Sequence, residues 1–475
     1  MFAILTVTRD AFEYATQKRL SGAFLSIDQA KAFDRVRHTY LLQVMREFGF
    51  PASFVDLVGL LYRNLTCQVV VNGAASTSFN YTRGIRQGCP LGPTFFIMSL
   101  EPLLTIRTED VNIRGFPLTG KEEVNVLGYA DDVSLFLRDA SSLNRFCYVF
   151  NRYADVSRAK INEGKSRALP FGSFPKEALG TIATVDAVKV LGVYFSRSGV
   201  AECTWQRALE RAQAVTDGVK SFDLTLQEKA LAVKARVCAF ANYVSRIATM
   251  PSKTANQMNK LIGDLLWDGQ PAPVRRILLR LPVNKGGLGL PHVLTTSKVL
   301  PLKTARQLHQ AGDYLGKNLL RYWCSTHTKF LEAERHTCPL AESPSAFYKT
   351  AANTWRMLET KAPECDIDQD PPVRIVECVT RRQLPEEDKR KAEAWKKSKA
   401  KQSRGLPKEV QDFEWRRNWD VLSSRERLHR FGVVPSARCP NCRADESTEH
   451  ALFECPAAKP VWRLTAKDFK IRPPP

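Results

Sequence analysis

The chain has 475 residues, of which 44% are hydrophobic and 25% are charged, so it can bury large cores and is neither disordered nor collagen-like. Its 70 basic and 49 acidic residues give a formal net charge of +21, which favours a polyanionic partner such as nucleic acid over an ordinary solvated surface. No apolar run reaches a membrane-spanning length, and the first residues lack the basic start of a secretory signal. The twelve scattered cysteines are typical of a reducing compartment, with thiols buried or bound to metal.

The first 200 residues alternate strand-like and helix-like segments. Alternating or continuous apolar runs predict strands, and apolar residues three to four apart predict helices. This is the pattern of an α+β fold with hairpins rather than regular strand–helix–strand repeats. The predicted strands are residues 23–27, 68–71 (ended by the hairpin signal Asn72-Gly73), 133–137 and 188–195, and the predicted helices are residues 36–48, 54–65 and 94–104.

Helical patterns dominate the remainder of the chain. Residues 203–265 form long amphipathic stretches, and residues 300–380 are less regular but also favour helices. Two compact signatures lie between them, at residues 266–270 and 284–291, and the second is rich in glycine. The window 381–430 holds 16 basic and 9 acidic residues, so 16 − 9 = +7 of the net charge is concentrated there.

Two acidic clusters lie where predicted strands end. Asp28 follows the strand at residues 23–27, and Asp131 and Asp132 occupy the predicted tip of a β-hairpin. Carboxylates brought together repel unless a cation lies among them, and Mg²⁺ prefers carboxylate oxygen. A two-metal site of this kind suits phosphoryl or nucleotidyl transfer. For each cluster taken alone, an ordinary exposed turn or a helix cap is the favoured interpretation.

The segments between and after these clusters carry further polar signals. Residues 82–93 form a loop punctuated by glycine and proline that opens a helix, and the loop offers Arg86, Gln87 and Gly88 to a phosphate or base pair. A polar turn at residues 162–166 carries Lys165, and Leu191-Gly192 interrupts an apolar β segment.

In chain order, these residues resemble the motifs A to E of reverse transcriptases. The resemblance rests on Asp28 with Phe33-Asp34, on the run from Arg86 to Leu91, on Tyr129-Ala-Asp-Asp132, on Gly164-Lys165 and on Leu191-Gly192. The sequences of these motifs are most similar to those of non-long-terminal-repeat, or LINE-type, retrotransposons. The resemblance implies a right-hand polymerase palm at residues 1–200 with a remnant of the fingers, a helical thumb-like region at 201–298, a helical and basic linker at 299–410, and a zinc-knuckle region at 411–475.

The resemblance also implies an activity, RNA-directed DNA polymerization by two-Mg²⁺ nucleotidyl transfer. By position, Asp28, Asp131 and Asp132 bind the two ions, and Lys165 is the general acid for the pyrophosphate leaving group. Phe33 is the steric gate against a 2′-hydroxyl, although a core aromatic is the plainer interpretation of an isolated phenylalanine. Arg86, Gln87, Gly88 and Tyr129 contact nucleotide, template or primer. The implied partners are template RNA, primer or target DNA and dNTP, in a nuclear and cytoplasmic ribonucleoprotein and with no membrane.

Two departures from this family leave an alternative open. Only 27 residues precede Asp28, which implies an N-terminally truncated chain in which residues 3–20 are the tail of the fingers. No endonuclease is recognizable. The alternative function is therefore a catalytically inactive nucleic-acid-binding remnant. A metal-dependent nuclease is a third candidate, which the intact palm motifs disfavour.

A cysteine–histidine module lies near the end of the chain. Cys439, Cys442, His450 and Cys455 have the spacing C-x2-C-x7-H-x4-C, which suits one tetrahedral, structural Zn²⁺. Around the module, tryptophans such as Trp415 and Trp419 alternate with arginines. Stacking on bases and packing within the small domain are both possible roles of these tryptophans, and packing is the favoured interpretation.

Overall fold

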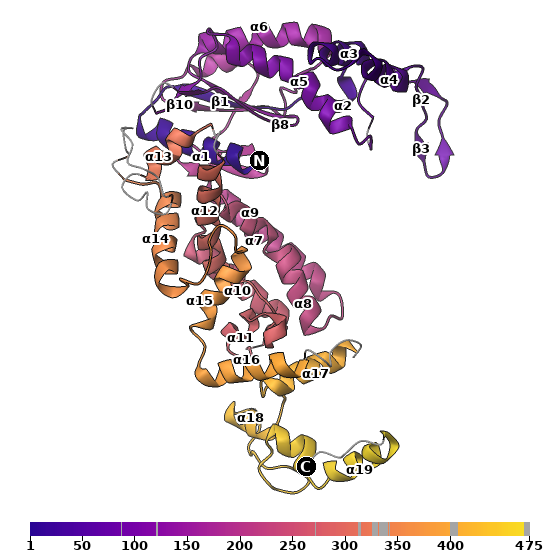
Figure 1. Cartoon of the computed structure of the whole chain (residues 1–475), viewed down its shortest axis with the longest axis vertical. Coiled ribbons are helices and arrows are strands. Elements are labelled where there is room, and N and C mark those ends of the chain that lie inside the picture. The colour runs from indigo at the N-terminus through magenta and orange to yellow at the C-terminus, as the bar shows by residue number, and fades with distance from the viewer. Residues whose placement is uncertain are drawn as a thin grey trace. The chain divides into compact units, whose positions relative to one another are not determined.

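The structure is a computed structural model that describes residues 1–86, 88–119, 122–270, 272–311, 315–324, 331, 341, 343–399 and 407–469. The chain forms two compact units (Figure 1). The first unit comprises Met1–Gln206, Val244–Thr249 and Pro301–Trp355, and the second comprises Arg207–Tyr243, Met250–Leu300 and Arg356–Pro475. The four predicted regions stay predictions. Four helices are divided between the units: α7 (Glu202–Lys220), α9 (Ala239–Ser245), α12 (Val293–Gln310) and α14 (Ala346–Lys361).

A five-stranded sheet forms the centre of the first unit. Its middle strand pairs antiparallel with a neighbour on each side, and only the outermost pair, β10 and β11, is parallel. The resulting mixture of hairpins and helices confirms the predicted α+β fold. In order across the sheet, the strands are β11 (Ala183–Thr184), β10 (Arg167–Phe171), β1 (Gly22–Ile27), β9 (Asp132–Leu137) and β8 (Val126–Tyr129).

Strand alternation divides the core of this unit between the two faces of the sheet. Leu25 and Leu135 belong to the core that packs against the helices of one face, and both are fully buried. Phe24 and Phe136 belong to the opposite face. Asp139 caps one of the two longest covering helices, α6, by accepting a 2.8 Å hydrogen bond from the Ser142 N–H. These helices are α2 (Ala32–Arg35), α3 (His38–Glu47), α4 (Ala52–Tyr62), α5 (Gly92–Glu109) and α6 (Ala140–Ser157).

The N-terminal helix α1 (Phe2–Gln17) covers the second face of the sheet. Its Phe12 lies edge-on to Phe24 and Phe136, with ring centroids 4.9 and 6.0 Å away. The prediction that residues 3–20 are the tail of the fingers stays a prediction, and in the structure most of this segment, α1, packs on the sheet. An apolar stripe on a helix packs readily on a sheet, and the sequence signal for a fingers motif was absent.

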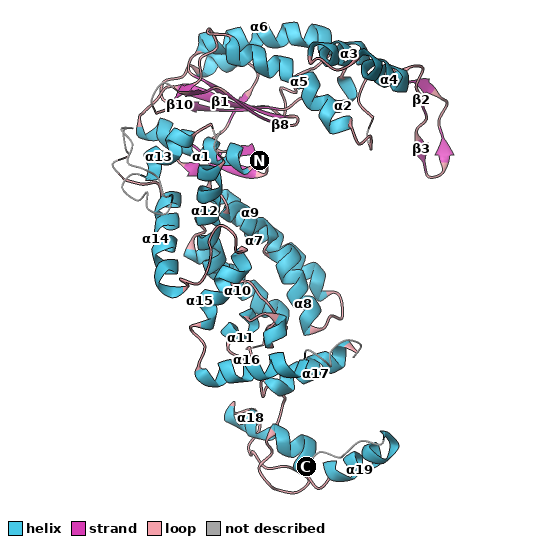
Figure 2. Cartoon of the chain, viewed as in Figure 1, coloured by secondary structure: helices cyan, strands magenta, loops and turns pink. Residues whose placement is uncertain are grey.

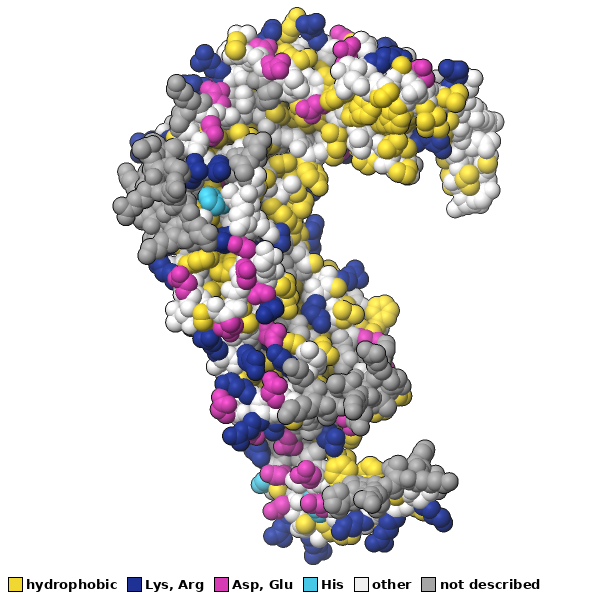
Figure 3. All heavy atoms as spheres, viewed as in Figure 1, with side chains coloured by type: hydrophobic (Ala, Val, Ile, Leu, Met, Phe, Trp, Pro, Cys, Tyr) yellow, Lys and Arg dark blue, Asp and Glu magenta, His cyan; other side chains and the backbone are white. Residues whose placement is uncertain are grey.

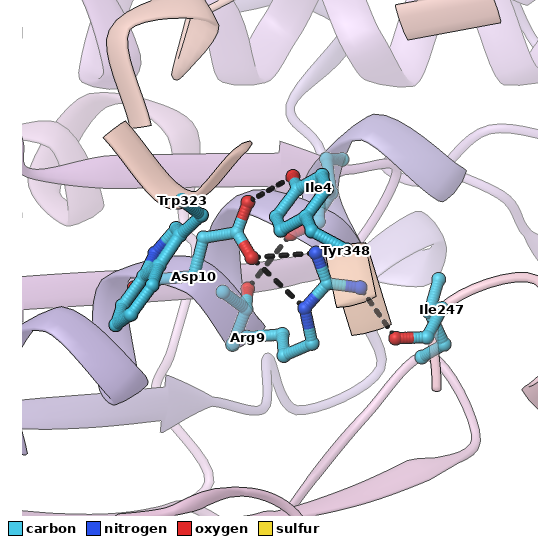
Figure 4. Close-up of polar contacts among 7 residues, drawn as sticks. Ile4, Arg9, Asp10, Ile247, Trp323 and Tyr348 are labelled. Carbon is cyan, nitrogen blue, oxygen red and sulfur yellow. Dashed lines mark hydrogen bonds and ion pairs between the residues drawn. The ribbon is translucent and has the colours of Figure 1, made fainter. Parts of the chain in front are cut away.

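A buried polar cluster ties α1 to segments far away in the sequence (Figure 4). Arg9 is 1% exposed and donates from Nε and Nη2 to one oxygen of Asp10, at 2.9 and 2.5 Å. Arg9 also donates to the Ile247 carbonyl, and the Tyr348 hydroxyl donates to the second Asp10 oxygen at 2.7 Å. The Trp323 indole of α13 (Lys317–Cys324) donates to the Asp10 carbonyl at 3.4 Å. We call this set the ionic anchor. Residues 301–355, whose role the sequence left open, thus complete the first unit.

Short hairpins lie beside the sheet. The predicted turn at Asn72-Gly73 is confirmed. The predicted strand at residues 188–195 is instead two strands, because Leu191 and Gly192 adopt φ of 45° and 86° and turn the chain back. The short strands are β2 (Thr66–Cys67), β3 (Val70–Val71), β4 (Ala74–Ala75), β5 (Phe79–Asn80), β6 (Phe116–Pro117), β7 (Glu123–Val124), β12 (Val188–Val190), β13 (Val193–Ser196) and β14 (Gly199–Val200), and a 3-10 turn spans Lys176–Leu179.

The described part of the second unit is helical, with strands drawn only in the first (Figure 2). A capping box, in which Thr225 and Glu228 each bond the other's backbone N–H, starts α8. Lys and Arg side chains are frequent on the visible face of this unit (Figure 3). Its helices are α8 (Leu226–Ala232), α10 (Ser252–Leu266), α11 (Arg276–Arg280), α15 (Pro372–Arg381), α16 (Glu386–Lys399), α17 (Lys408–Asn418), α18 (Arg425–Arg430) and α19 (Ala458–Phe469), with π-turns at Val233–Val237 and His450–Glu454 and a 3-10 turn at Val283–Lys285.

Three tryptophans pack around the glycine-rich signature of this unit. The indoles of Trp415 and Trp419 both donate to the Gly286 carbonyl at 2.7 Å, and that of Trp395 donates to Val283 at 3.3 Å. Gly286 has φ of 81°, and a Cβ there would lie 3.1 Å from Trp395 and 3.2 Å from Trp419. We call this set the tryptophan anchor. It explains why the segment requires glycine.

None of the described helices is long and apolar enough to cross a lipid bilayer.

Candidate active site and metal-binding module

Asp28 stands at the end of the central strand, on a backbone that is fixed from both sides. The buried residues of β1 extend to Ile27, so the next residue emerges at the edge of the sheet. The Asp28 N–H donates to Ser166 Oγ at 3.1 Å, and its carbonyl accepts from the Asn162 N–H at 2.8 Å. Ser166 is fully buried. The turn that carries Lys165 therefore holds the carboxylate-bearing residue in place.

Asp131 and Asp132 lie at the tip of the β8–β9 hairpin, as predicted. Tyr129 pairs with Asp132, and Ala130 takes a left-handed φ of 53° to close the turn. Because Ile27 of β1 is paired with Val133 of β9, the antiparallel register places Asp28 beside Asp132. The fold therefore brings the three predicted carboxylates, which are separated by about a hundred residues in the sequence, to one edge of the sheet.

The electrostatics show that these three carboxylates interact. The pKa of Asp132 is raised above its ordinary value by burial, by the charge of Asp131 and by the charge of Asp28. Lys189, on β12, opposes this shift. Lys189 points outward because its strand neighbours Val188 and Val190 are buried. Sequence reasoning missed this lysine, because nothing in a Val-Lys-Val run indicates which distant hairpin it faces.

One predicted nucleotide-binding segment, the glycine-rich loop, is tied by its backbone to the chain that follows Asp28. Backbone hydrogen bonds from Gly84 to Val36 and from Ile85 to Phe33, at 2.7 and 2.8 Å, join the start of the glycine-rich loop to the segment after Asp28. Arg86 and Gly88 are exposed, and Gly88 has φ of 82° with open space where a Cβ would be. Gln87 lies outside the described residues.

The remaining predicted residues differ in how far they are buried and in whether they contact other side chains. Phe33 is half-buried and stacks on Phe96, with ring centroids 4.4 Å apart, so it is both a packed aromatic and partly open to a ligand. Tyr129 is 46% exposed beside the acidic turn. Lys165 is exposed, and none of the carboxylates that the structure describes forms an ion pair with it.

The cysteine–histidine module gathers all four of its predicted ligands. One ligand atom from each of Cys439, Cys442, His450 and Cys455 lies within 4.8 Å of the others. The Cys439 and Cys455 sulfurs are 3.9 Å apart, and Cys442 Sγ is 3.2 Å from His450 Nε2. These separations suit a tetrahedron of three sulfurs and one nitrogen around Zn²⁺. Within the described parts of the chain, this is the only group of three or more such side chains gathered so closely.

Local backbone structure holds this module together. Arg443 has a left-handed φ of 65°, and its N–H donates to the Cys439 carbonyl at 2.9 Å, which closes the first pair of ligands into a tight turn. The Ser447 hydroxyl accepts from the His450 N–H at 3.0 Å and starts the π-turn that ends at the last cysteine. A hydrogen bond from the Ala457 backbone lowers the pKa of the Cys455 thiol and favours the thiolate that binds metal.

The tryptophans near this module pack rather than stack on an external base. Trp415 and Trp419 are buried in the tryptophan anchor, which confirms the favoured interpretation. Phe431 remains 64% exposed, with Arg427 over its ring at 5.3 Å. Arg427 is not free for a phosphate, because its guanidinium donates to the Asp420 and Pro273 carbonyls.

Comparisons with known proteins find two families that match parts of this chain. Residues 3–195 match the family described as reverse transcriptase (RNA-dependent DNA polymerase), and residues 381–462 match zinc-binding in reverse transcriptase. A 149 kDa protein of transposon TX1 from Xenopus laevis is 29% identical over 75% of this chain and 28% of its own length. The Pol polyprotein of element R2DM from Drosophila melanogaster is 22% identical over 65% of this chain and 30% of its own. The telomerase structure from Candida tropicalis with a telomeric RNA fragment covers 69% of this chain and 51% of that one, at 11% identity and a TM-score of 0.35.

The palm sheet with its three carboxylates, the first family match and the zinc-binding match together define a reverse transcriptase domain followed by its zinc-binding domain. Residues 3–195 match the reverse transcriptase family and residues 381–462 match its zinc-binding domain, and the curated relatives described above relate the chain to non-LTR retrotransposons. It spans less than a third of the two curated relatives described above, at 28% and 30% of their lengths.

Proposed function

We propose that this chain is an RNA-directed DNA polymerase that extends a DNA primer on an RNA template. The observation that carries the proposal is the placement of Asp28 beside Asp132 and Asp131, with the pKa of Asp132 raised by burial and by both neighbouring carboxylates. Acidic groups that raise one another's pKa stabilise a bound divalent cation, and their oxygens are the ligands Mg²⁺ prefers. These three carboxylates are therefore the residues that would hold Mg²⁺, and their oxygens are less closely gathered than the ligand atoms of the zinc module.

When bound, such ions would stabilise negative charge on the reacting phosphate and activate the primer 3′-hydroxyl. The chain's own residues would position the reacting groups. Ser166 and the Asn162 backbone fix Asp28, and Tyr129 lies beside the acidic turn, where a primer end would lie. Lys165, on the same turn as Asn162, is exposed and is our candidate to protonate the pyrophosphate leaving group.

The nucleotide would meet the half-buried Phe33 and the exposed loop around Arg86 and Gly88, with Gln87 in the same loop. Phe33 rests on Phe96, so its ring is fixed and excludes a 2′-hydroxyl by volume rather than by a hydrogen bond. The proposed partners are therefore template RNA, primer or target DNA and dNTP, within a nuclear and cytoplasmic ribonucleoprotein.

The test is primer extension by the full chain with an RNA template, an annealed DNA primer, Mg²⁺ and dNTPs. We expect extension, and we expect combined Asp131→Ala and Asp132→Ala substitutions to reduce it by at least about a thousandfold, because both would contact the reacting groups through metal. Asp155→Ala removes an exposed carboxylate from α6 and should leave the rate unchanged. If the chain binds RNA in a salt-sensitive manner but extends no primer, it is the inactive remnant.

We further propose that Cys439, Cys442, His450 and Cys455 bind one structural Zn²⁺. The support is the gathering of three sulfurs and one imidazole nitrogen within 4.8 Å, with no ligand position left for a substrate. Metal analysis should find one zinc per chain in the wild type and none in Cys442→Ser, whereas Cys147→Ser, at an exposed thiol of α6, should retain it. Equal zinc content in all three proteins would contradict this site.

A further inference from the structure

A solvent-accessible cavity of about 270 Å³ lies in the second unit, away from the zinc module and built by residues 259–291 alone. Its lining residues belong to the second half of α10, the turn after it, the helix α11 and the chain at Leu290-Pro291. None of the roles assigned above uses it. Its volume is just below the range of about 300–1,000 Å³ typical of drug-sized ligands, so its occupant is a compact group.

The lining of this cavity carries an excess of positive charge. Three cations, Lys260, Arg276 and Arg280, line it together with one carboxylate, Asp264. None of the three cations forms an ion pair with a carboxylate that the structure describes. Arg275, the neighbour of Arg276, differs in this respect, because it pairs with Asp388 at 3.2 Å. Cations that are gathered without partners favour an anionic ligand.

Arg280 is the least exposed of these three cations. It is half-buried, and burial together with the charge of Arg276 lowers its pKa to about 10. The nearby His292 has its pKa lowered to about 4 by burial, by Arg280 and by Lys298, so it is neutral at physiological pH and adds no charge. A partly buried guanidinium of this kind can bind two oxygens of one phosphate.

The remaining wall of the cavity is suited to a flat, partly polar ring. Trp267 and Leu279 contribute apolar surface, and the side-chain amides of Asn259 and Gln270 contribute both donors and acceptors. The other four tryptophans of this unit, Trp395, Trp415, Trp419 and Trp462, each donate the indole N–H to a backbone carbonyl. The Trp267 indole has no such partner among the described residues, although the side chain is only 8% exposed. A donor at the cavity wall is thus left for a ligand.

We propose that this cavity receives one unpaired nucleotide of a single strand, with its base against the wall that contains Trp267 and its phosphate on Arg276 and Arg280. Bases stack on aromatic surfaces and are read by amide side chains, and their phosphates bind arginine. The lining residues of this cavity belong to the second unit, and none of them belongs to the proposed polymerase centre. RNA and DNA share the chemistry that the cavity recognises.

The test is photo-cross-linking of the full chain to single-stranded oligonucleotides that carry 5-iodouracil, in an RNA and a DNA version, with the linked peptide identified by mass spectrometry. We expect a cross-link within residues 259–291. Combined Arg276→Gln and Arg280→Gln substitutions should reduce it by about tenfold or more, as expected when a stacked, phosphate-anchored base is lost. Arg275→Gln removes the same kind of charge from the adjacent position outside the cavity and should leave the cross-link intact.

Folding is checked by thermal unfolding of each variant, and Arg280→Lys supplies a milder change that keeps the charge but loses the bidentate geometry. A cross-link that persists in the double variant, or the absence of any cross-link at residues 259–291 with both polymers, overturns the proposal. Comparing the two polymers identifies the strand. The variant with Asp131→Ala and Asp132→Ala should keep this cross-link while it loses extension, so the failure of one proposal is distinguishable from the failure of the other.

Discussion

Each unit is stabilised internally by its own buried anchor, and the two anchors have opposite chemistry. In the first unit, the ionic anchor joins α1 to residues 247, 323 and 348 through a buried guanidinium and a buried carboxylate. In the second, the tryptophan anchor joins α16 and α17 to the glycine-rich signature through neutral indoles. Both connect segments that are far apart in the sequence, and both are nearly inaccessible to solvent.

The two anchors differ in how much stability the fold loses when one partner of the anchor is removed. A buried charge that loses its partner retains its full desolvation penalty, whereas a neutral N–H that loses its acceptor retains a smaller one. The Gly286 carbonyl has two lone pairs, so it accepts from both Trp415 and Trp419 without leaving either indole unpaired. We therefore expect the first unit to respond strongly to the loss of a charge and the second unit to respond to a change of shape.

The largest expected effect follows from Asp10→Ala. It leaves Arg9 buried without its carboxylate, and we expect a loss of about 3–5 kcal/mol in the free energy of unfolding of the first unit. Tyr348→Phe removes only one hydrogen bond to the carboxylate and should cost about 1.5–3 kcal/mol. Hydrogen exchange read by mass spectrometry on peptides of β1 and β9 measures this unit separately from the second.

The matched control replaces both charges with apolar side chains, as Arg9→Met with Asp10→Leu. Because no uncompensated charge remains, this double variant should be more stable than Asp10→Ala alone. If the double variant is as unstable as the single one, the anchor acts through its shape rather than its charge, and the contrast between the two units fails.

The next effect is Gly286→Ala, which tests shape in the second unit. Alanine disfavours φ of 81°, and its Cβ would press on Trp395 and Trp419, so we expect a loss of about 2–4 kcal/mol. Gly432→Ala is the matched control, because Gly432 has φ of 70° but open space around a Cβ, and it should cost only about 1–2 kcal/mol. Hydrogen exchange should rise in residues 283–291 and not in β1. Equal losses for the two glycines would show that the tryptophans do not determine the effect.

The sequence was informative where a function requires a residue type at a strand end. Asp28, Asp131 and Asp132 were predicted because strands project their next residues from a sheet edge, and the four zinc ligands were predicted because their spacing is short. Ser166 and Lys189 were not predicted, since each acts on the acids through a contact made only in the folded chain.

The sequence was less informative about packing between distant segments. Arg9 reads as one of many surface arginines, and only the approach of Tyr348, more than 300 residues later, shows that it is buried. The same holds for Gly286, whose neighbours Trp395 and Trp419 are found more than a hundred residues away. The apolar pattern predicted one strand over residues 188–195. Hydrophobic periodicity does not reveal that Leu191 adopts a left-handed backbone conformation and turns the chain.

The smallest expected effect is a pH dependence of stability, which we expect at the ionic anchor and not at the tryptophan anchor. Burial raises the pKa of Glu13, next to the ionic anchor, to about 7 from its ordinary 4.5, while Arg9 opposes the shift. The folded chain keeps a proton that the unfolded chain releases, so this group stabilises the fold fully below about pH 4.5 and the stabilisation is lost as the pH rises through about 7. Glu13 is only partly buried, and we expect the loss to be about 1–2 kcal/mol between pH 5 and pH 8.

Glu13→Gln should remove this pH dependence from peptides of β1 and β9, once exchange rates are corrected for the intrinsic effect of pH. Glu47→Gln, at an exposed position of α3, should leave it in place. The tryptophan anchor contains no titrating group, so exchange at residues 283–291 should be the same in the Glu13 variant and the wild type at every pH in this window. A pH dependence that Glu13→Gln shifts equally in both units would mean that the two anchors are coupled, and that the first unit does not respond to charge by itself.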